Sequence, residues 1–427
     1  MENFYLIDYI KRHSGIDADI LDSIKYELDK SIYYYGGHFR RPKEFSGNYK
    51  AALWEWLGRF YCEYRYIFKI LLKKSDMDTG KRIISNAYFT VNEELEGLGY
   101  NVYTPPWSLA DSKNVLNDIR FYHICKKMNG ILNKSEFAGL ICGAFLKRVE
   151  DFRDELKSFY TKNKISALIV PNDVAFFENL SIKVFKDMHR PSFVFLHGLP
   201  GRYNNIDENR ADYLIVWGEK IKEHYIKAGL PREKILVSGH PYYKKFNNPA
   251  LKSDTGNILV ITKSMNGSQH GDGACLSDRG NPILYLYSIR NVLKKNGVKS
   301  VRLRVHPSEN RNWYLKFVDK DFFKLDIESL SNSFKRSTLV IGPSSTVFLE
   351  SIYHGVNYLI YEPADHGIDL MNFKLVPPFD GNDGKIPVAN SEDELMTLLE
   401  RNIKTEVSFF GDYIKTPFDV SFIKKYI

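Results

Sequence analysis

Two segments in the second half of the sequence place polar side chains directly after apolar runs. In VRLRVHP, the run is followed at once by His306 and Pro307. In STLVIGPSSTVFLE, Ser344 and Ser345 follow the run, and a helix is expected to begin at Thr346. Hydroxyl and backbone N–H groups at a helix start bind anions, and the helix dipole assists. An imidazole nearby can donate to a phosphate oxygen and help a nucleotide to depart. The two segments therefore predict a nucleotide-phosphate site.

Each of these residues also has a purely structural interpretation. Ser344 or Ser345 alone would be interpreted as a helix N-cap, and His306 alone as a hydrogen-bonded loop histidine. Ligands of open α/β sheets, however, bind at the carboxyl ends of the strands. Because both segments follow consecutive strand-like runs, the phosphate-binding interpretation is favoured.

A glycine-rich segment, KSMNGSQHGDGACLSDRG, follows the strand-like run NILVIT. Glycines allow the backbone to approach a phosphate closely, so Ser264 and Gly267 are further candidates for donor binding. The segment lacks GK[ST] and GxGxxG, which argues against an ATPase or a dinucleotide enzyme. An ordinary surface loop is the alternative. No DxD-type pair of carboxylates stands out for a nucleotide-bound metal, so neither a metal nor a cofactor is expected.

The first half of the sequence offers two candidates for a base that would deprotonate an acceptor hydroxyl. His197 ends the run SFVFLHG, and an imidazole with a pKa near ~6.5 suits this task. Asp173 ends ALIVPND and is expected to be exposed. A structural histidine beside the following Gly/Pro loop is the alternative for His197. The base therefore stays open between the two, while His240 in SGHPYY is expected to be structural.

The elements that carry these residues alternate between strands and helices. Residues 1–79 read as a helical N-terminal extension, and residues 80–250 contain the strand-like runs of a first α/β domain. After the polar segment NNPALKSDT, residues 251–402 form a second α/β series that would bind the donor nucleotide. Residues 403–427 are expected to pack back on the first domain. The alternation predicts two Rossmann-like domains that face a central cleft.

The composition is that of a soluble globular protein, with 427 residues of which 44% are hydrophobic and 26% charged. A net charge of +8 favours an anionic partner without identifying it. The four cysteines are far apart and lack metal-site spacing, which indicates a reducing compartment. The sequence shows neither a signal peptide nor an apolar run of ~20 residues. We therefore expect a cytoplasmic protein.

The N-terminal segment ALWEWLGRFYCEYRYIFKILLKK mixes aromatic and basic side chains. A helix of this kind suits peripheral contact with an anionic membrane at the inner face of the cell, where it would hold a lipid-linked acceptor. A helix packed on the α/β core is the favoured alternative. Such a mixture also suits single-stranded nucleic acid, but nothing else in the sequence supports a nucleic-acid partner.

The motif RVHP and the later GPSSTVFLE resemble the HP and SS motifs of bacterial GT-B glycosyltransferases. The most similar sets are the sialyltransferases, polysialyltransferases and Kdo transferases. In those families the HP histidine and the serine pair contact the phosphate of a CMP-activated sugar. The resemblance implies that His306, Ser344 and Ser345 hold the donor nucleotide. It also implies a ribose contact for Glu350, for which an exposed helix acid is the alternative.

A second likeness lies in the first half, where FLHGLPGRY resembles the HG motif of CDP-glycerol polyol-phosphate transferases. Together the two likenesses cover roughly residues 165–365. The acidic-Gly motif that supplies the base in sialyltransferase-like families is matched poorly, because its nearest counterpart, Glu94 to Gly97, falls inside a predicted helix. By resemblance, Asp173 is preferred as the base of a CMP-sugar enzyme and His197 as that of a glycerophosphotransferase.

The sequence thus predicts an inverting, metal-independent GT-B glycosyltransferase. It would move a nonulosonic acid such as sialic acid, or Kdo, from a CMP-linked donor to a bacterial capsule or lipopolysaccharide glycan. The alternatives are a CDP-glycerol or polyol-phosphate transferase, a UDP-sugar glycosyltransferase, a sugar-nucleotide epimerase of the same shape, and a non-catalytic capsule-assembly scaffold.

Overall fold

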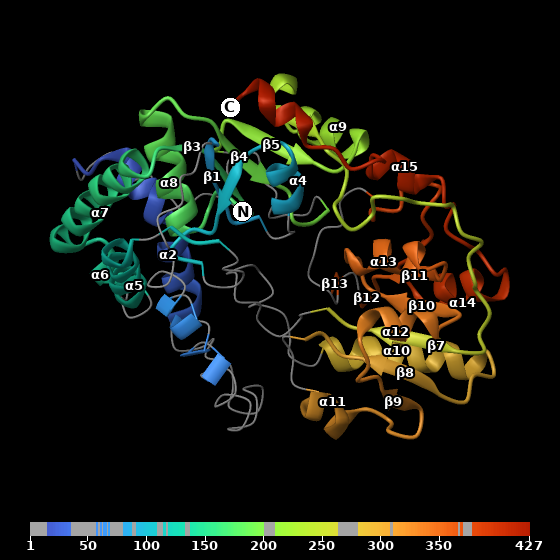
Figure 1. The fold of residues 1–427 in the computed structure, drawn as a ribbon. Coiled ribbons are helices and arrows are strands. Elements are labelled where there is room, and N and C mark those ends of the chain that lie inside the picture. Colours follow the sequence, from blue (N-terminus) through green and yellow to red (C-terminus); the bar gives the residue numbers. More distant parts are fainter. Residues whose placement is uncertain are drawn as a thin grey trace.

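The computed structural model contains two six-stranded parallel β-sheets, each flanked by helices, and Figure 1 shows them in two separate halves of the molecule. The structure describes residues 15–35, 57–58, 60–61, 63–65, 67–68, 80–87, 91–108, 114–116, 118–132, 137–199, 210–263, 281–307, 311–365, 368–369 and 378–427. The first half holds the N-terminal sheet and the second half holds the C-terminal sheet.

The N-terminal sheet has the strand order β2-β1-β3-β4-β5-β6. Its strands are β1 (Arg82–Ser85), β2 (Asn101–Tyr103), β3 (Ile165–Val170), β4 (Ser192–Phe195), β5 (Tyr213–Val216) and β6 (Ile235–Val237). The sequence of β3 is ISALIV, and five of its six residues are buried. Continuous apolar runs of this kind form strands that are covered on both faces. From β1 the chain passes to β2 on one side and β3 on the other, so the strand order reverses between β1 and β3.

Helices and one 3-10 turn accompany this sheet. They are α2 (Ala18–Tyr35), α4 (Asn92–Gly97), α5 (Ile119–Leu132), α6 (Phe137–Leu140), α7 (Gly143–Lys162), α8 (Phe176–Asp187), α9 (Glu219–Lys227) and the 3-10 turn η2 (Arg232–Lys234). Helix α8 contacts β3 and β4, and α2 of the N-terminal extension packs on α8. Ion pairs hold α2 there, because Asp22 lies 3.1 Å from Lys183 Nζ and 2.7 Å from Arg210 Nε.

The C-terminal sheet has the strand order β14-β11-β10-β7-β8-β9. Its strands are β7 (Ile258–Ile261), β8 (Val301–Arg304), β9 (Phe323–Leu325), β10 (Leu339–Gly342), β11 (Asn357–Tyr361) and β14 (Val388–Ala389), and a separate antiparallel pair is formed by β12 (Ala364–Asp365) and β13 (Ile368–Asp369). The chain leaves β7 toward β8 and returns on the other side as β10. The strand order therefore reverses between β7 and β10.

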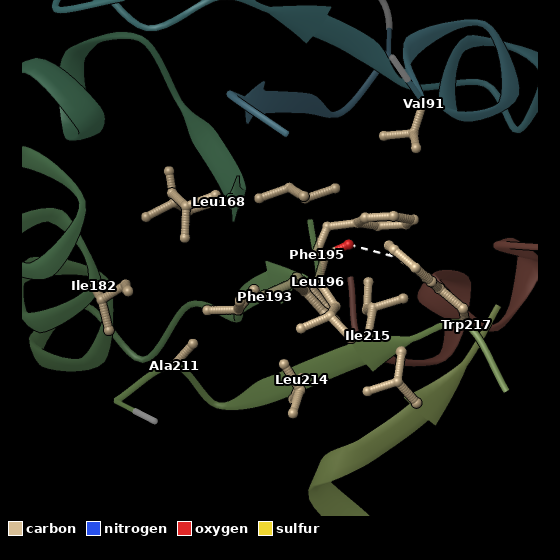
Figure 2. Packing of buried hydrophobic residues seen from close by; sticks show 14 of the residues in the cluster. Val91, Leu168, Ile182, Phe193, Phe195, Leu196, Ala211, Leu214, Ile215 and Trp217 are labelled. Atoms are coloured by element: carbon tan, nitrogen blue, oxygen red, sulfur yellow. Dashed lines mark hydrogen bonds between the residues drawn. The ribbon is translucent and has the colours of Figure 1, made fainter. Parts of the chain in front are cut away.

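The second half has two apolar layers, one on each face of its sheet. Its helices are α10 (Asn281–Lys295), α11 (Arg311–Phe317), α12 (Leu330–Lys335), α13 (Val347–Tyr353) and α14 (Glu392–Glu400). One layer, which contains Leu286, Leu303 and Leu395, is a core of its own. The other layer, which contains Val340 and Phe348, is continuous with the core of the first half. Figure 2 shows part of that core, where the Trp217 indole N–H donates to the Leu196 carbonyl oxygen at 2.9 Å.

The C-terminal segment returns to the first half through α15 (Phe409–Tyr413) and the 3-10 turn η4 (Ser421–Lys425), as Figure 1 shows in red. The Lys415 N–H donates to the Trp217 carbonyl oxygen at 2.8 Å, and the Asp419 N–H donates to the Ser238 carbonyl oxygen at 2.8 Å. These bonds attach the segment to the loops after β5 and β6.

This architecture confirms the predicted α/β class with two Rossmann-like halves, each built on a six-stranded parallel sheet. Their pairing as in the GT-B fold stays a prediction. The four-part division at residues 80, 251 and 403 stays a prediction. None of the helices that the structure describes is both long enough and apolar enough to cross a membrane.

Candidate functional site

Polar side chains gather at the carboxyl edge of the C-terminal sheet. Lys263 follows β7, His306 follows β8, Ser344 follows β10 and Glu362 follows β11, and these four strands are neighbours in the sheet. The edge includes the point between β7 and β10 where the strand order reverses. Open parallel sheets bind their ligands at such points because the flanking loops diverge there. The sheet order therefore brings together residues that the sequence separates.

Two hydrogen-bonded contacts join these strand ends. The His306 N–H donates to the Thr262 hydroxyl oxygen at 3.0 Å. The ammonium group of Lys263, the next residue, lies 3.4 Å from the Ser344 hydroxyl oxygen. The HP and SS motifs are thus linked through the end of β7. This link was not predicted from the sequence.

Glu362 is the member of this group that the sequence analysis missed. Its Oε1 accepts from the Ser344 N–H at 2.6 Å, from Lys263 Nζ at 3.2 Å and also from the Ser344 hydroxyl. Only 2% of its side chain is exposed. The other oxygen, Oε2, is buried and has no hydrogen-bond partner within the described residues. An acidic residue directly after the apolar run NYLIY was the available signal.

The two serines of the SS motif have different surroundings. Ser344 is engaged by Glu362, whereas the Ser345 hydroxyl accepts from the Val347 N–H at 3.3 Å, which is a capping contact at the start of α13. Thr346 is exposed, and so is Pro307 on the neighbouring loop. Burial lowers the pKa of half-buried His306, so its imidazole is mainly neutral near pH 7.

Glu350 lies on α13, one turn beyond the SS motif. It is partly buried, and burial raises the pKa of its carboxyl group, while the charge of Arg304 opposes that shift. The alternative of a fully exposed helix acid does not describe this residue. No described hydrogen bond connects Glu350 to Ser344 or His306, and its ribose contact stays a prediction.

His197 lies at the end of β4 in the first half and is exposed. Its Nδ1 is 3.0 Å from the Pro171 carbonyl oxygen, which follows β3. A carbonyl oxygen can only accept, so this contact places the proton on Nδ1 of the neutral imidazole. Nε2 then carries the lone pair, as a general base requires.

The expectation that Asp173 would be exposed is wrong, because only 6% of the residue is exposed. Its carboxylate accepts from the Arg210 N–H, and burial raises its pKa to about 6. The chain turns inward here because the Asn172 side chain accepts from the N–H groups of Val174 and Ala175, at 3.2 and 2.9 Å. Asp173 is therefore engaged with the backbone, and His197 is the more accessible of the two candidate bases.

The HG segment and the SS motif meet across the two halves. A β-carbon placed on Gly198 would lie 3.9 Å from Thr346 Cγ2, which is ordinary van der Waals distance. Gly198 adjoins His197, and Thr346 adjoins the serine pair. The two halves therefore bring the candidate base next to the candidate phosphate site.

A buried acid was also missed at the carboxyl edge of the N-terminal sheet. Glu178 accepts from the Asn86 amide at 3.0 Å and from the Trp107 indole N–H at 3.3 Å. Asn86 follows β1 and Trp107 lies in the loop after β2, so the group lies where the order of this sheet reverses. Burial raises the pKa of Glu178 to about 7. No local pattern indicated this acid, because Glu178 lies within the apolar start of α8.

The remaining candidates are placed as follows. Ser264 and Gly267 lie outside the described residues. His240 is buried, accepts from the Tyr242 N–H at 3.1 Å, and has its pKa lowered by burial to about 3. The string from Glu94 to Gly97 lies in α4, as predicted.

Across the described parts of the chain, no three His, Cys, Asp or Glu side chains come together as a metal site would require.

No protein-family model and no curated protein matches the chain. Among solved structures, the UDP-GlcNAc 2-epimerase of Methanocaldococcus jannaschii is 12% identical, with a TM-score of 0.45 over 80% of this chain and 96% of that one. The lipopolysaccharide outer core galactosyltransferase WaaB is 11% identical, with a TM-score of 0.44 over 82% and 98%. The wall teichoic acid polymerase TagF is 12% identical, with a TM-score of 0.38 over 87% and 96%. At these values the likenesses carry no argument about the function of this chain.

Proposed function

We propose that the protein is an inverting GT-B glycosyltransferase that uses a nucleotide-activated sugar. The observation that carries the proposal is the approach of Gly198 to Thr346, where an added β-carbon would lie 3.9 Å from Thr346 Cγ2, because it brings the HG segment of one half near the SS motif of the other. A transfer reaction needs a base for the acceptor and a phosphate site for the departing nucleotide within reach of one sugar. The residues beside this contact supply both.

In the proposed reaction, the donor phosphate lies against the ends of β8 and β10. His306 and the backbone N–H groups of Ser345 and Thr346 donate hydrogen bonds to it. His197 Nε2 takes the proton of the acceptor hydroxyl, whose oxygen then forms a bond to the anomeric carbon. The bond between that carbon and the phosphate oxygen breaks, and the nucleotide leaves with the electron pair. Donors fixed in advance stabilise the charge that develops on the leaving group.

A CMP-linked nonulosonic acid or Kdo is the first choice of donor, because it accounts for the HP and SS motifs together. Polyol-phosphate transfer from CDP-glycerol is the second candidate. It is favoured by the exposure and tautomer of His197, the base associated with the HG motif. A UDP-linked sugar is a third choice on the same scaffold.

The acceptor in this proposal is a glycan or a lipid-linked glycan of the bacterial surface, and the enzyme works in the cytoplasm. Peripheral contact with an anionic membrane is part of the proposal. It is supported by exposed rings on the short helical stretch near residue 60, namely Phe60, Tyr61, Tyr64 and Phe68.

Two substitutions test the proposal. His197→Asn should lower kcat by about 10²–10⁴-fold, because it removes the base, and should leave nucleotide affinity unchanged. His306→Ala should weaken both nucleotide binding and turnover. The measurements are a thermal-shift panel with CMP, CDP, UMP, UDP, GDP and ADP, followed by turnover with the sugar donor of the preferred nucleotide. Binding of no nucleotide would refute the proposed site and favour the scaffold alternative. Full turnover by both variants would refute the roles assigned to His197 and His306.

A further inference from the structure

The donor site proposed above already contains an anion that belongs to the protein. The Glu362 carboxylate occupies both hydrogen-bond donors of Ser344, its N–H at 2.6 Å and its hydroxyl. It also pairs with Lys263, whose Nζ lies 3.2 Å from Oε1. A phosphate oxygen would seek these same three groups. Glu362 thus occupies the hydrogen-bond donors and the cation at the part of the sheet edge nearest to β11.

The charge of this pair is balanced without a ligand. Lys263 contributes one positive charge and Glu362 one negative charge, and their side chains are only 16% and 2% exposed. Electrostatic interactions are weakly screened at buried positions, so a second anion beside Glu362 would meet strong repulsion. The other members of the proposed phosphate site are the backbone of Ser345 and Thr346 and the His306 imidazole. His306 is mainly neutral near pH 7 because burial lowers its pKa.

Stability alone gives no reason for this arrangement. Burying a charge is costly unless all of its lone pairs are satisfied, and Oε2 of Glu362 has no partner in the described part of the chain. A buried acid with an unsatisfied oxygen, bonded to Lys263 and Ser344 on the two sides of the point where the sheet order reverses, is better explained by what it does to a ligand.

We propose that Glu362 determines donor specificity by excluding a second phosphate group. The site accepts a nucleotide joined to its sugar through one phosphate, such as a CMP-linked sugar, and disfavours diphosphate donors. This inference rests on the proposed function and makes it narrower, because it separates the CMP-linked donor from the CDP- and UDP-linked alternatives.

The test compares the affinity of the full-length protein for CMP and for CDP by isothermal titration calorimetry. The wild type should bind CMP at least about tenfold more tightly than CDP, a difference of about 1.4 kcal/mol. In Glu362→Gln, the amide still accepts from Ser344 but carries no charge. CDP affinity should therefore rise about tenfold or more, while CMP affinity changes much less. A gain in affinity cannot result from misfolding.

Two further variants complete the design. Glu400→Gln removes the same charge from an exposed position on α14 and should keep the wild-type preference. Lys263→Gln leaves the Glu362 charge unbalanced and should increase the preference for CMP over CDP. It keeps the test decisive if Glu362→Gln does not fold.

The possible failures are distinguishable. If the wild type binds no nucleotide, both the proposed function and the role of Glu362 are refuted. If it binds CMP and the ratio of the two affinities is the same in Glu362→Gln, only the role of Glu362 is overturned. Equal affinity of the wild type for CMP and CDP would overturn it as well.

Discussion

At the scale of single residues, buried carboxyl groups make this protein sensitive to pH. Glu178 and Asp173 both lie near the carboxyl edge of the N-terminal sheet, and burial raises their pKa values to about 7 and about 6. Glu178 accepts two neutral hydrogen bonds, from Asn86 and Trp107, and has no cation among these partners. The folded state therefore binds a proton at Glu178 more tightly than the unfolded state, whose glutamate titrates near 4.5.

The sign of the pH dependence follows from this difference. Because the pKa is raised on folding, the protonated form stabilises the native state at low pH, and that contribution is lost as the pH rises from about 4.5 through about 7. Glu178→Gln removes the titration and keeps an acceptor for Asn86 and Trp107. The free energy of unfolding of this variant, relative to the wild type, should increase by roughly 2–3 kcal/mol between pH 5 and pH 8.

Urea unfolding at the two pH values measures this difference. The exposed acid Glu96 on α4 provides the control, since Glu96→Gln should shift the stability equally at both pH values. Parallel pH profiles for Glu178→Gln and the wild type would contradict the assignment of a raised pKa to Glu178.

At the scale of elements, the C-terminal segment passes so close to two loops that only glycine fits there. A β-carbon on Gly218 would lie 2.3 Å from the carbonyl oxygen of Tyr413, and one on Gly239 would lie 2.3 Å from that of Lys415. Gly239 also has a φ of +86°, a conformation that other residues rarely adopt. The loops after β5 and β6 thus serve as the docking surface for residues 413–419.

The cost of this close approach can be separated from the cost of the backbone conformation. Gly297 has a similar φ of +76° but no atom within 4 Å of its added β-carbon. Gly297→Ala should lower the free energy of unfolding by about 1 kcal/mol, because alanine is strained in this backbone conformation. Gly239→Ala should cost roughly 1–3 kcal/mol more, because the segment must also move. Chemical denaturation of the two variants gives both values, and equal losses would show that the segment is not tightly docked.

At the scale of the whole molecule, the proposed reaction requires the two halves to keep their relative position. The Gly198–Thr346 approach is one contact between them. Ion pairs form another, since Lys220 of α9 lies 3.1 Å from Asp383 and 3.4 Å from Asp412. The core of the first half also extends under α13. The candidate base and the candidate phosphate site are therefore held together by contacts between the halves.

Enlarging Gly198 tests this arrangement. Gly198→Ala should be tolerated, because 3.9 Å is an ordinary contact distance. Gly198→Leu should push Thr346 away and lower kcat/KM by about 10²-fold, since reacting groups displaced by about 1 Å lose that much rate. Equal turnover of the Ala and Leu variants would argue against a shared site at this contact.

The sequence by itself determined the α/β class and the strands with longer apolar runs, together with their ends, whereas the short strands β2, β9 and β14 were not predicted. Apolar runs that end in Gly, Pro, Asn or Asp are local signals, and the alternation with helical stretches leaves few topologies other than parallel sheets. The positions of His197, His306 and Ser344 at strand ends followed from the same signals. Their presence at the carboxyl edges of the two sheets needed no knowledge of tertiary contacts.

Only the tertiary structure decided which of these residues meet and which are buried. Lys263, Ser344 and Glu362 come together because β7, β10 and β11 lie side by side, an order that no local pattern encodes. Asp173 is buried because its loop folds against Arg210, and Glu178 because α8 packs on the sheet between other helices. Contacts of this kind depend on how whole elements pack, whereas strand ends depend on a few adjacent residues.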